Sequence, residues 1–160
     1  MTHHVDAPRS HSVVHATFRL ERTYPVPPQR VFDAFRDPSV KRRWSVEADR
    51  GEVQEHTLDF RIGGRETTRF RFDNGPEMSS DTTYLDIVQD SHILYAFRMT
   101  IGGHPAAAAL TTVELARSGD GTLLTYTEQG AFLDGMHAPD TAEHGSGVLL
   151  QRLGEVLSNA

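Results

Sequence analysis

One acidic residue stands out as a group that could do chemistry. Glu128 lies between Tyr126 and Gly130, in a segment whose alternating apolar residues predict a β-strand. If that face of the strand points inward, loss of hydration raises the pKa of the carboxyl group and makes Glu128 a candidate general base. A register shift of one residue would instead place the side chain in solvent. Glu128 is therefore the candidate catalytic residue of the sequence.

Four of the nine histidines are the other candidates for chemistry near neutral pH: His56, His104, His137 and His144. His56 begins a predicted strand and His104 follows two glycines in a turn, so we expect both on the surface. Asp134 and Asp140 lie near the last two histidines, but this group lacks the tight ligand pairs by which metal sites are recognised in a sequence. We expect no metal site.

The sequence contains none of the motifs that mark other common chemistries. It has no Cys, which excludes disulfides, thiolate metal sites and a cysteine nucleophile. It has no G-x-S-x-G elbow, no P-loop and no G-x-G-x-x-G fingerprint, so neither acyl transfer at an elbow serine nor nucleotide chemistry has a motif behind it. We expect no cofactor.

The composition is that of one globular domain. The chain has 160 residues, 38% of them hydrophobic, with 16 Lys+Arg against 22 Asp+Glu and a net charge of −6. A negative chain repels polyphosphate and anionic lipid, so nucleic acid and membrane are not expected partners. No apolar run is longer than Ala106–Leu110, which is far shorter than the ~18 residues that span a bilayer, and a cytoplasmic location is expected.

The N-terminal part of the chain changes character several times. Residues 1–12 mix polar types without a period, which predicts a flexible arm. Residues 13–24 alternate apolar and polar side chains, which predicts a strand with one buried face. Prolines end it, and apolar residues at helical spacing over 31–35 predict a short helix. A second short helix is predicted over 38–44, with the basic run Lys41-Arg42-Arg43 on its solvated face.

The middle of the chain predicts three hairpins. Their strands are His56–Ile62 with Arg65–Phe72, Thr82–Val88 with Ile93–Ile101, and Leu110–Ala116 with Thr122–Phe132. Gly63-Gly64 predicts a two-residue turn in the first hairpin. Together with the first strand they make about seven strands joined by short turns, which favours an antiparallel meander.

The tail returns to helical spacing. Asp140 and Glu143 have the spacing of a capping box, and an apolar stripe follows them: Leu149, Leu150, Leu153, Val156 and Leu157. Gly145, Gly147 and Gly154 are unusual there, because glycine in a helix interior costs about 0.5–1 kcal/mol relative to Ala. Either the helix begins later than Asp140 or it needs small residues at these positions.

A single helix about 10 Å wide cannot cover the concave face of a seven-stranded sheet. We therefore expect an apolar cavity between sheet and helix that binds a small hydrophobic or aromatic ligand. The side chains expected to line it are large and mostly apolar: Phe35, Trp44, Phe60, Phe72, Tyr84, Tyr95, Phe97, Met99, Tyr126, Phe132 and Leu149. Each of them could equally serve core packing alone.

Several motifs follow one another in a characteristic order. They are PPQRVFDAF at 27–35, DP at 37–38, KRRW at 41–44, FRIGGR at 60–65, TYLDIV at 83–88, ILYAF at 93–97 and GTLLTYTEQGAF at 121–132. In this order they resemble the SRPBCC (START-like) superfamily, and within it the branch named after the activator of the heat-shock-protein-90 ATPase. The resemblance covers roughly residues 13–157.

The resemblance implies a single START-like domain over residues 13–158 with an α+β helix-grip fold. In that fold about seven antiparallel strands wrap around a long C-terminal helix, with two short helices between the first two strands. Many relatives have a Gly-Trp pair early in the last helix, where this chain has Gly145-Ser146. The missing indole implies a wider cavity or mouth.

Three functions are compatible with these features, because the superfamily holds lipid carriers, aromatase/cyclases, hormone receptors and chaperone co-factors. The first is binding of a small hydrophobic or aromatic ligand. The second is an enzyme resembling the polyketide cyclases, with Glu128 as proton shuttle and a tyrosine orienting a carbonyl. The third is a co-chaperone that stimulates an ATPase. A homodimer is plausible for each of them.

Overall fold

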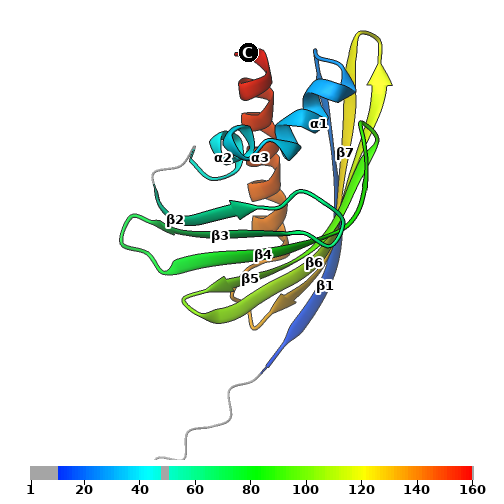
Figure 1. Ribbon diagram of the computed structural model, residues 1–160. Helices are drawn as coiled ribbons and strands as arrows, with labels where there is room; N and C mark the ends of the chain where they lie inside the picture. The colour runs from blue at the N-terminus through cyan, green and yellow to red at the C-terminus, as the bar shows by residue number, and fades with distance from the viewer. Residues whose placement is uncertain (1–10, 48–50, 160) are drawn as a thin grey trace, which may run out of the picture.

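The computed structural model describes residues 11–47 and 51–159. Its elements in chain order are β1 (Val13–Tyr24), α1 (Pro28–Arg36), α2 (Pro38–Ser45), β2 (Gly51–Leu58), β3 (Arg65–Phe72), β4 (Glu77–Val88), β5 (His92–Ile101), β6 (His104–Ser118), β7 (Gly121–Leu133) and α3 (Pro139–Ser158). The strands form one antiparallel sheet that curves around α3, while α1 and α2 cover one end of it (Figure 1). The expected helix-grip architecture is confirmed.

The strand order explains how the sheet is completed. It is β1-β7-β6-β5-β4-β3-β2, so the last six strands form the expected meander. The first strand lies beside the last one, with Phe18 opposite Glu128, and not beside β2. The two short helices make the connection that carries the chain from one edge of the sheet to the other.

The short helices begin and end at residues suited to those positions. Pro28 occupies the first turn of α1, where its missing N–H costs nothing. The side chain of Asp37 accepts a hydrogen bond from the Ser39 amide and caps α2. Trp44 is buried against Phe35, and its indole N–H donates to the Ala34 carbonyl at 2.9 Å. Trp44 therefore packs the two helices together in the core.

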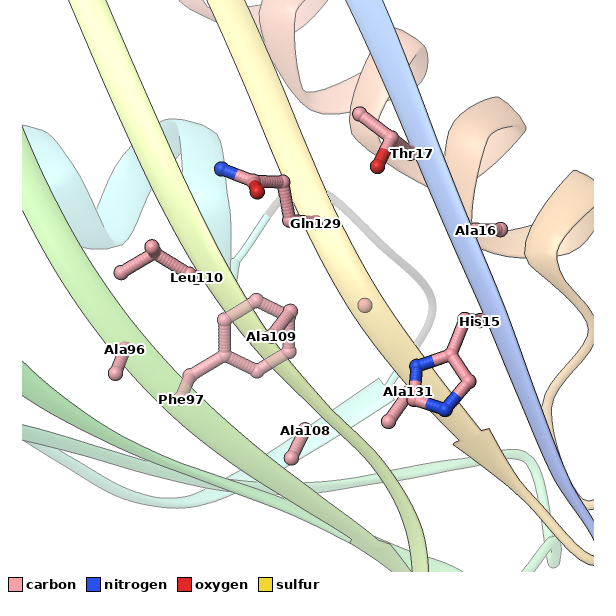
Figure 2. A pocket seen from close by; sticks show the side chains of 11 residues that line it. His15, Ala16, Thr17, Ala96, Phe97, Ala108, Ala109, Leu110, Gln129 and Ala131 are labelled. Atoms are coloured by element: carbon pink, nitrogen blue, oxygen red, sulfur yellow. The ribbon is translucent and has the colours of Figure 1, made fainter.

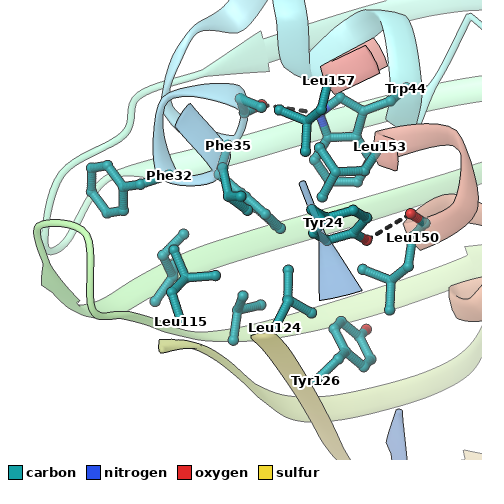
Figure 3. Packing of buried hydrophobic residues seen from close by; sticks show 14 of the residues in the cluster. Tyr24, Phe32, Phe35, Trp44, Leu115, Leu124, Tyr126, Leu150, Leu153 and Leu157 are labelled. Carbon is teal, nitrogen blue, oxygen red and sulfur yellow. Dashed lines mark hydrogen bonds between the residues drawn. The ribbon is translucent and has the colours of Figure 1, made fainter. Parts of the chain in front are cut away.

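The C-terminal helix buries its predicted apolar stripe in this core (Figure 3). The buried side chains of α3 are Ala142, Leu150, Leu153 and Leu157. The Tyr24 hydroxyl donates to the Leu150 carbonyl at 2.7 Å. A Cβ at Gly154 would lie 3.2 Å from the Tyr24 ring, so any larger residue there would require the ring to shift by a few tenths of an ångström. No helix in the described ranges is long and apolar enough to cross a membrane.

The predicted capping box at the start of α3 is wrong. The N-cap residue is Ala138, which makes no side-chain cap, and Asp140 lies inside the first turn. Pro139 sets this start, because its fixed φ suits the first helical position and its missing N–H needs no partner. The helix runs through all three glycines, so it does not begin later than expected.

Three strands begin earlier than their hydrophobic patterns predict. β2 begins at Gly51, β4 at Glu77 and β6 at His104. The added ends of β2 and β4 contain no fully buried residue, so the alternation of apolar and polar residues fades there, and the added end of β6 runs through four consecutive alanines, which show no alternation. The turn of the first hairpin is also longer than Gly63-Gly64: it spans residues 59–64, and the Gly64 amide donates to the Arg61 carbonyl.

The predicted arm of residues 1–12 lies mostly outside the described residues. Its last residue, Ser12, is held to the turn after β7: its amide donates to Asp134 Oδ1 at 2.8 Å, and its carbonyl accepts from the Asp134 amide at 2.9 Å. Ser12 is therefore anchored to the domain.

Candidate functional site

Glu128 points into the protein from the middle of β7. Its residue is 3% exposed, and its neighbours across the sheet are Phe18 on β1 and Thr111 on β6. The Tyr126 hydroxyl donates to Glu128 Oε1 at 2.9 Å. Burial raises the pKa of Glu128 to about 7, and the hydrogen bond from Tyr126 offsets only part of that effect. The register of β7 therefore places the Glu128 side chain in the interior and not in solvent, as a general base at this position would require.

Further polar groups gather around this carboxyl group. Thr111 is 0% exposed, and its Oγ1 atom has no hydrogen-bond partner in the described parts of the chain. The Ser146 hydroxyl of α3 donates to the Tyr126 hydroxyl at 3.4 Å. Tyr95 lies across the sheet from Thr111, and burial together with the neighbouring Tyr126 raises its pKa well above the usual value. We call Glu128, Tyr126, Thr111, Tyr95 and Ser146 the Glu128 cluster.

An apolar strip leads from this cluster towards solvent along β5. Ile93 is completely buried, whereas Tyr95, Phe97 and Met99, which share its side of the strand, are only half-buried. The far ends of β2 to β5 reach past α3 in Figure 1. Burial on the concave face of β5 therefore decreases from Ile93 towards Met99.

The exposed end of this face carries Phe70 and Phe72 on β3. Their ring centroids are 5.0 Å apart, and Phe72 is 38% exposed. Met78 on β4 pairs with Phe70 and with Ile101 on β5, and both Met78 and Ile101 are half-buried. These apolar side chains lie at the rim of the concave face.

The side chains predicted to line a cavity fall into three groups. Those in the closed core are Phe35, Trp44, Tyr84, Tyr126 and Phe132. Those that are half-buried are Phe60, Tyr95, Phe97, Met99 and Leu149. Phe72 alone among them is exposed. The half-buried group and the rim therefore hold the side chains that remain partly accessible to solvent.

The two hollows that stand out on the surface lie elsewhere. The first, of about 680 Å³, is on the outer face of β5, β6, β7 and β1, where Leu110 and Gln129 point away from the side that holds Thr111 and Glu128, and Figure 2 draws the residues that line it. Its lining includes His15, Thr17, Leu110 and Gln129. The second lies between the end of β1 and the last turns of α3. The first hollow shares only Phe97 with the side chains expected to line the cavity, and the second, although it lies between β1 and α3, shares none of them.

A second buried carboxyl group, which the sequence analysis missed, lies on β3. Glu66 is 7% exposed and accepts hydrogen bonds from Lys41 Nζ at 3.0 Å and the Tyr84 hydroxyl at 2.7 Å, with His56 Nε2 2.8 Å from its other oxygen. Burial alone would raise the pKa of Glu66, but the charge of Lys41 and the three bonds outweigh it and lower the pKa to about 2. We call these four residues the Glu66 cluster.

The Glu66 cluster corrects two predictions of surface exposure. Lys41 is buried, with its ammonium group 5.6 Å from the Phe35 ring centroid and 5.5 Å from that of Trp44. The His56 side chain is only 2% exposed. Both side chains face inward because Glu66 offers them a buried anion. One signal existed: Glu66 shares its strand face with Phe70, where an acidic residue is unusual.

The other histidines do not form a site. His104 is exposed, as expected, and so is His144. The His137 ring lies near the Phe132 ring, 6.1 Å between centroids, and burial lowers the pKa of His137. In the described part of the chain, no group of three or more His, Asp or Glu side chains could hold a metal ion.

Comparisons with known proteins agree with this architecture. The family model of the activator of Hsp90 ATPase homolog 1-like protein matches residues 25–158. The crystal structure of the Mll3558 protein from Rhizobium loti is 50% identical, with a TM-score of 0.84, covering 91% of this chain and 99% of that one. An uncharacterised protein from Rhizobium leguminosarum is 35% identical, with a TM-score of 0.89, covering 94% of this chain and 99% of that one.

A more distant neighbour shows how far the fold extends. The AHSA1-like protein from Aeromonas hydrophila is 15% identical and has a TM-score of 0.69, covering 90% of this chain and 93% of that one, so it is evidence for the fold alone. The family match covers α1 to α3, including both buried glutamates. The chain belongs to the family of activator of Hsp90 ATPase homolog 1-like proteins, consistent with the SRPBCC superfamily.

Proposed function

We propose that this protein binds a small hydrophobic or aromatic molecule on its concave face. The apolar body of the molecule would lie against the half-buried side chains of β5, and one polar group would reach the Glu128 cluster. One observation carries the proposal: Glu128 and Thr111 are buried polar residues with too few partners, next to an apolar strip that α3 leaves half-exposed. Buried polar groups without partners are costly, and a ligand would supply the missing ones.

The test is calorimetric titration with 1-naphthalenemethanol, together with the melting temperature. A ligand present at about 100 times its Kd stabilises the folded state by about 2.7 kcal/mol through mass action. Met99→Trp adds bulk to the apolar strip and should abolish binding. Leu110→Trp adds bulk on the outer face, beside the hollow of Figure 2, and should leave binding intact. No heat of binding and no rise in melting temperature would reject the proposal.

A second candidate function is proton transfer by Glu128, as in a cyclase-like enzyme. It is favoured by the buried position of the carboxyl group, its pKa of about 7 and the adjacent Tyr126 hydroxyl. The test is solvent deuterium exchange at the methyl group of 2-acetylnaphthalene, followed by mass spectrometry. Exchange that is accelerated by the protein and lost in Glu128→Gln supports this role, and exchange at the rate of buffer alone rejects it.

The co-chaperone function suggested by the family's description stays a prediction. No surface of the described residues favours it specifically, and a homodimer likewise stays a prediction. The cytoplasmic location is also a prediction at this stage.

A further inference from the structure

Glu128 is buried without a positive partner. Within the described ranges, the side chain that bonds its carboxyl group is Tyr126, and no cation contributes to its pKa. The same sheet supplies Lys41 and His56 to the other buried glutamate, Glu66. An ionised carboxylate in the interior is costly unless a cation or several donors accompany it. The described residues therefore supply a positive charge to Glu66 and none to Glu128.

Aromatic rings from neighbouring strands surround this region of the concave face. Phe18, directly opposite Glu128, lies 6.1 Å from Tyr126 between ring centroids. On the other side, Tyr95 lies 5.9 Å from Tyr84 and 6.5 Å from Phe97. Aromatic faces carry partial negative charge and attract cations, most strongly in desolvated sites. Rings and carboxyl group thus favour the same sign of ligand charge.

The unpartnered hydroxyl of Thr111 is an independent observation that points to a ligand. Thr111 is 0% exposed, is the cross-strand neighbour of both Glu128 and Tyr95, and has an Oγ1 atom that bonds to nothing in the described structure. A hydroxyl oxygen can accept a hydrogen bond, and an ammonium group has up to three N–H donors to offer. One ammonium group could therefore satisfy Glu128 and Thr111 together.

Building on the proposed binding function, we propose that the ligand is an aromatic or alicyclic amine. Its protonated nitrogen would lie at Glu128 and Thr111, and its apolar body would extend along Tyr95, Phe97 and Met99. A carboxylate or phosphate head group is disfavoured at this position because it would meet the charge of Glu128, to which the described part of the chain brings no compensating cation.

The groups that face Glu128 define the pH dependence of such binding. Tyr126 on β7 and Tyr95 on β5 are titratable, and their pKa values are raised by burial, so both stay neutral at ordinary pH. β1, β6 and α3 contribute Phe18, Thr111 and Ser146, which do not titrate. Glu128 is therefore the group that titrates in the accessible range, and an amine should bind best when it is ionised.

The experiment compares two probes of nearly equal shape, 1-naphthylmethylamine and 1-naphthalenemethanol, by calorimetric titration of the full chain. At about pH 8, the amine should bind roughly ten- to hundredfold more tightly, as expected for a charge-assisted hydrogen bond. At about pH 6, amine binding should release up to about one proton from Glu128, measured as a dependence of the heat on buffer ionisation, whereas the alcohol should release none.

Two variants locate the effect. Glu128→Gln should remove the preference for the amine and the proton release, while Glu114→Gln, which removes the same charge from an exposed position on β6, should keep both. If the alcohol binds as tightly as the amine, or if the preference survives in Glu128→Gln, the amine inference is overturned while apolar binding stands. If neither probe binds, the proposed binding function fails as well.

Discussion

Glu66 on β3 and Glu128 on β7 both point to the concave face of one sheet, and their residues are 7% and 3% exposed. Around Glu66 the fold places a lysine, a histidine and a tyrosine, and the pKa of Glu66 is lowered to about 2. Around Glu128 it places one tyrosine hydroxyl, and the pKa is raised to about 7. Burial is nearly the same, so the partners decide the opposite directions.

The difference separates a structural site from a candidate binding site. Glu66 on β3 is bonded to Lys41 of α2, His56 of β2 and Tyr84 of β4. Its carboxyl group therefore has its partners within the protein itself. The Glu128 cluster ends beside half-buried apolar side chains and contains an unpartnered hydroxyl. A buried charge with all its partners stabilises a particular packing, whereas one without them is a place where a ligand gains affinity.

The largest effect is expected at Glu66. Glu66→Gln leaves the buried Lys41 without its anion, and breaking a buried pair on one side costs about 3–5 kcal/mol. We expect a loss of this size in the free energy of unfolding, measured by urea denaturation at neutral pH. Glu55→Gln breaks a more exposed ion pair, between Glu55 on β2 and Arg69 on β3, and should cost less than about 1 kcal/mol. Equal losses in the two variants would mean that the Glu66 cluster contributes no more than a surface pair.

The next effect concerns the pH dependence of stability at Glu128. Its folded-state pKa of about 7 lies above the ordinary value of 4.5, so the folded state binds this proton more tightly. The stability it contributes is fully present below the unfolded pKa and is lost as pH rises through about 7. Glu128→Gln removes this loss, so between about pH 4.5 and pH 8 the variant should gain about 3 kcal/mol over the wild type. Urea denaturation across this range checks it, and parallel curves for the two proteins would contradict it.

Glu66 should show the opposite pH window. Its folded-state pKa of about 2 lies below the ordinary value of 4.5, so its contribution is present above the unfolded pKa and is lost as pH falls towards 2. The acid-induced part of unfolding should therefore weaken in Glu66→Gln and persist in Glu128→Gln.

The smallest effect concerns two buried threonines. Thr111→Val replaces the unpartnered hydroxyl with a methyl group and should stabilise the ligand-free protein by about 1 kcal/mol, because an unmet hydrogen-bonding group is removed. Thr122→Val is the matched control: Thr122 is also 0% exposed, but its hydroxyl donates to the Val26 carbonyl at 2.7 Å. It should lose about 1 kcal/mol. Thermal unfolding of both variants measures the difference in sign, and destabilisation by Thr111→Val would show that its hydroxyl has a partner.

Much of the fold could be predicted from the sequence. The alternation in residues 13–24 and in the three hairpins identified the strands, and the stripe over residues 149–157 identified the helix that buries them. The errors lie at strand ends and in the cap of α3, where Pro139 rather than Asp140 decides the start. At strand ends the apolar–polar alternation is weak because few residues are buried there, and at the start of α3 the fixed backbone angle of Pro139 decides where the helix begins.

The candidate site was predictable in part. Glu128 was identified from its strand, but its polar neighbours Thr111 and Ser146 were not, since each lies on a different element. The Glu66 cluster was missed for the same reason. Lys41 belongs to a basic run that looks solvated, and His56 to the start of a strand with a mixed pattern.

The order of residues along the chain alone determined where strands and helices form, because the period of apolar side chains is a property of neighbours in sequence. Only the tertiary structure decided which polar groups are buried and which of them find a partner. Lys41 and Glu66 are 25 positions apart, and Tyr126 and Ser146 are 20 apart. The charge state of a buried group depends on what the fold brings within hydrogen-bond distance, and no local pattern specifies that contact.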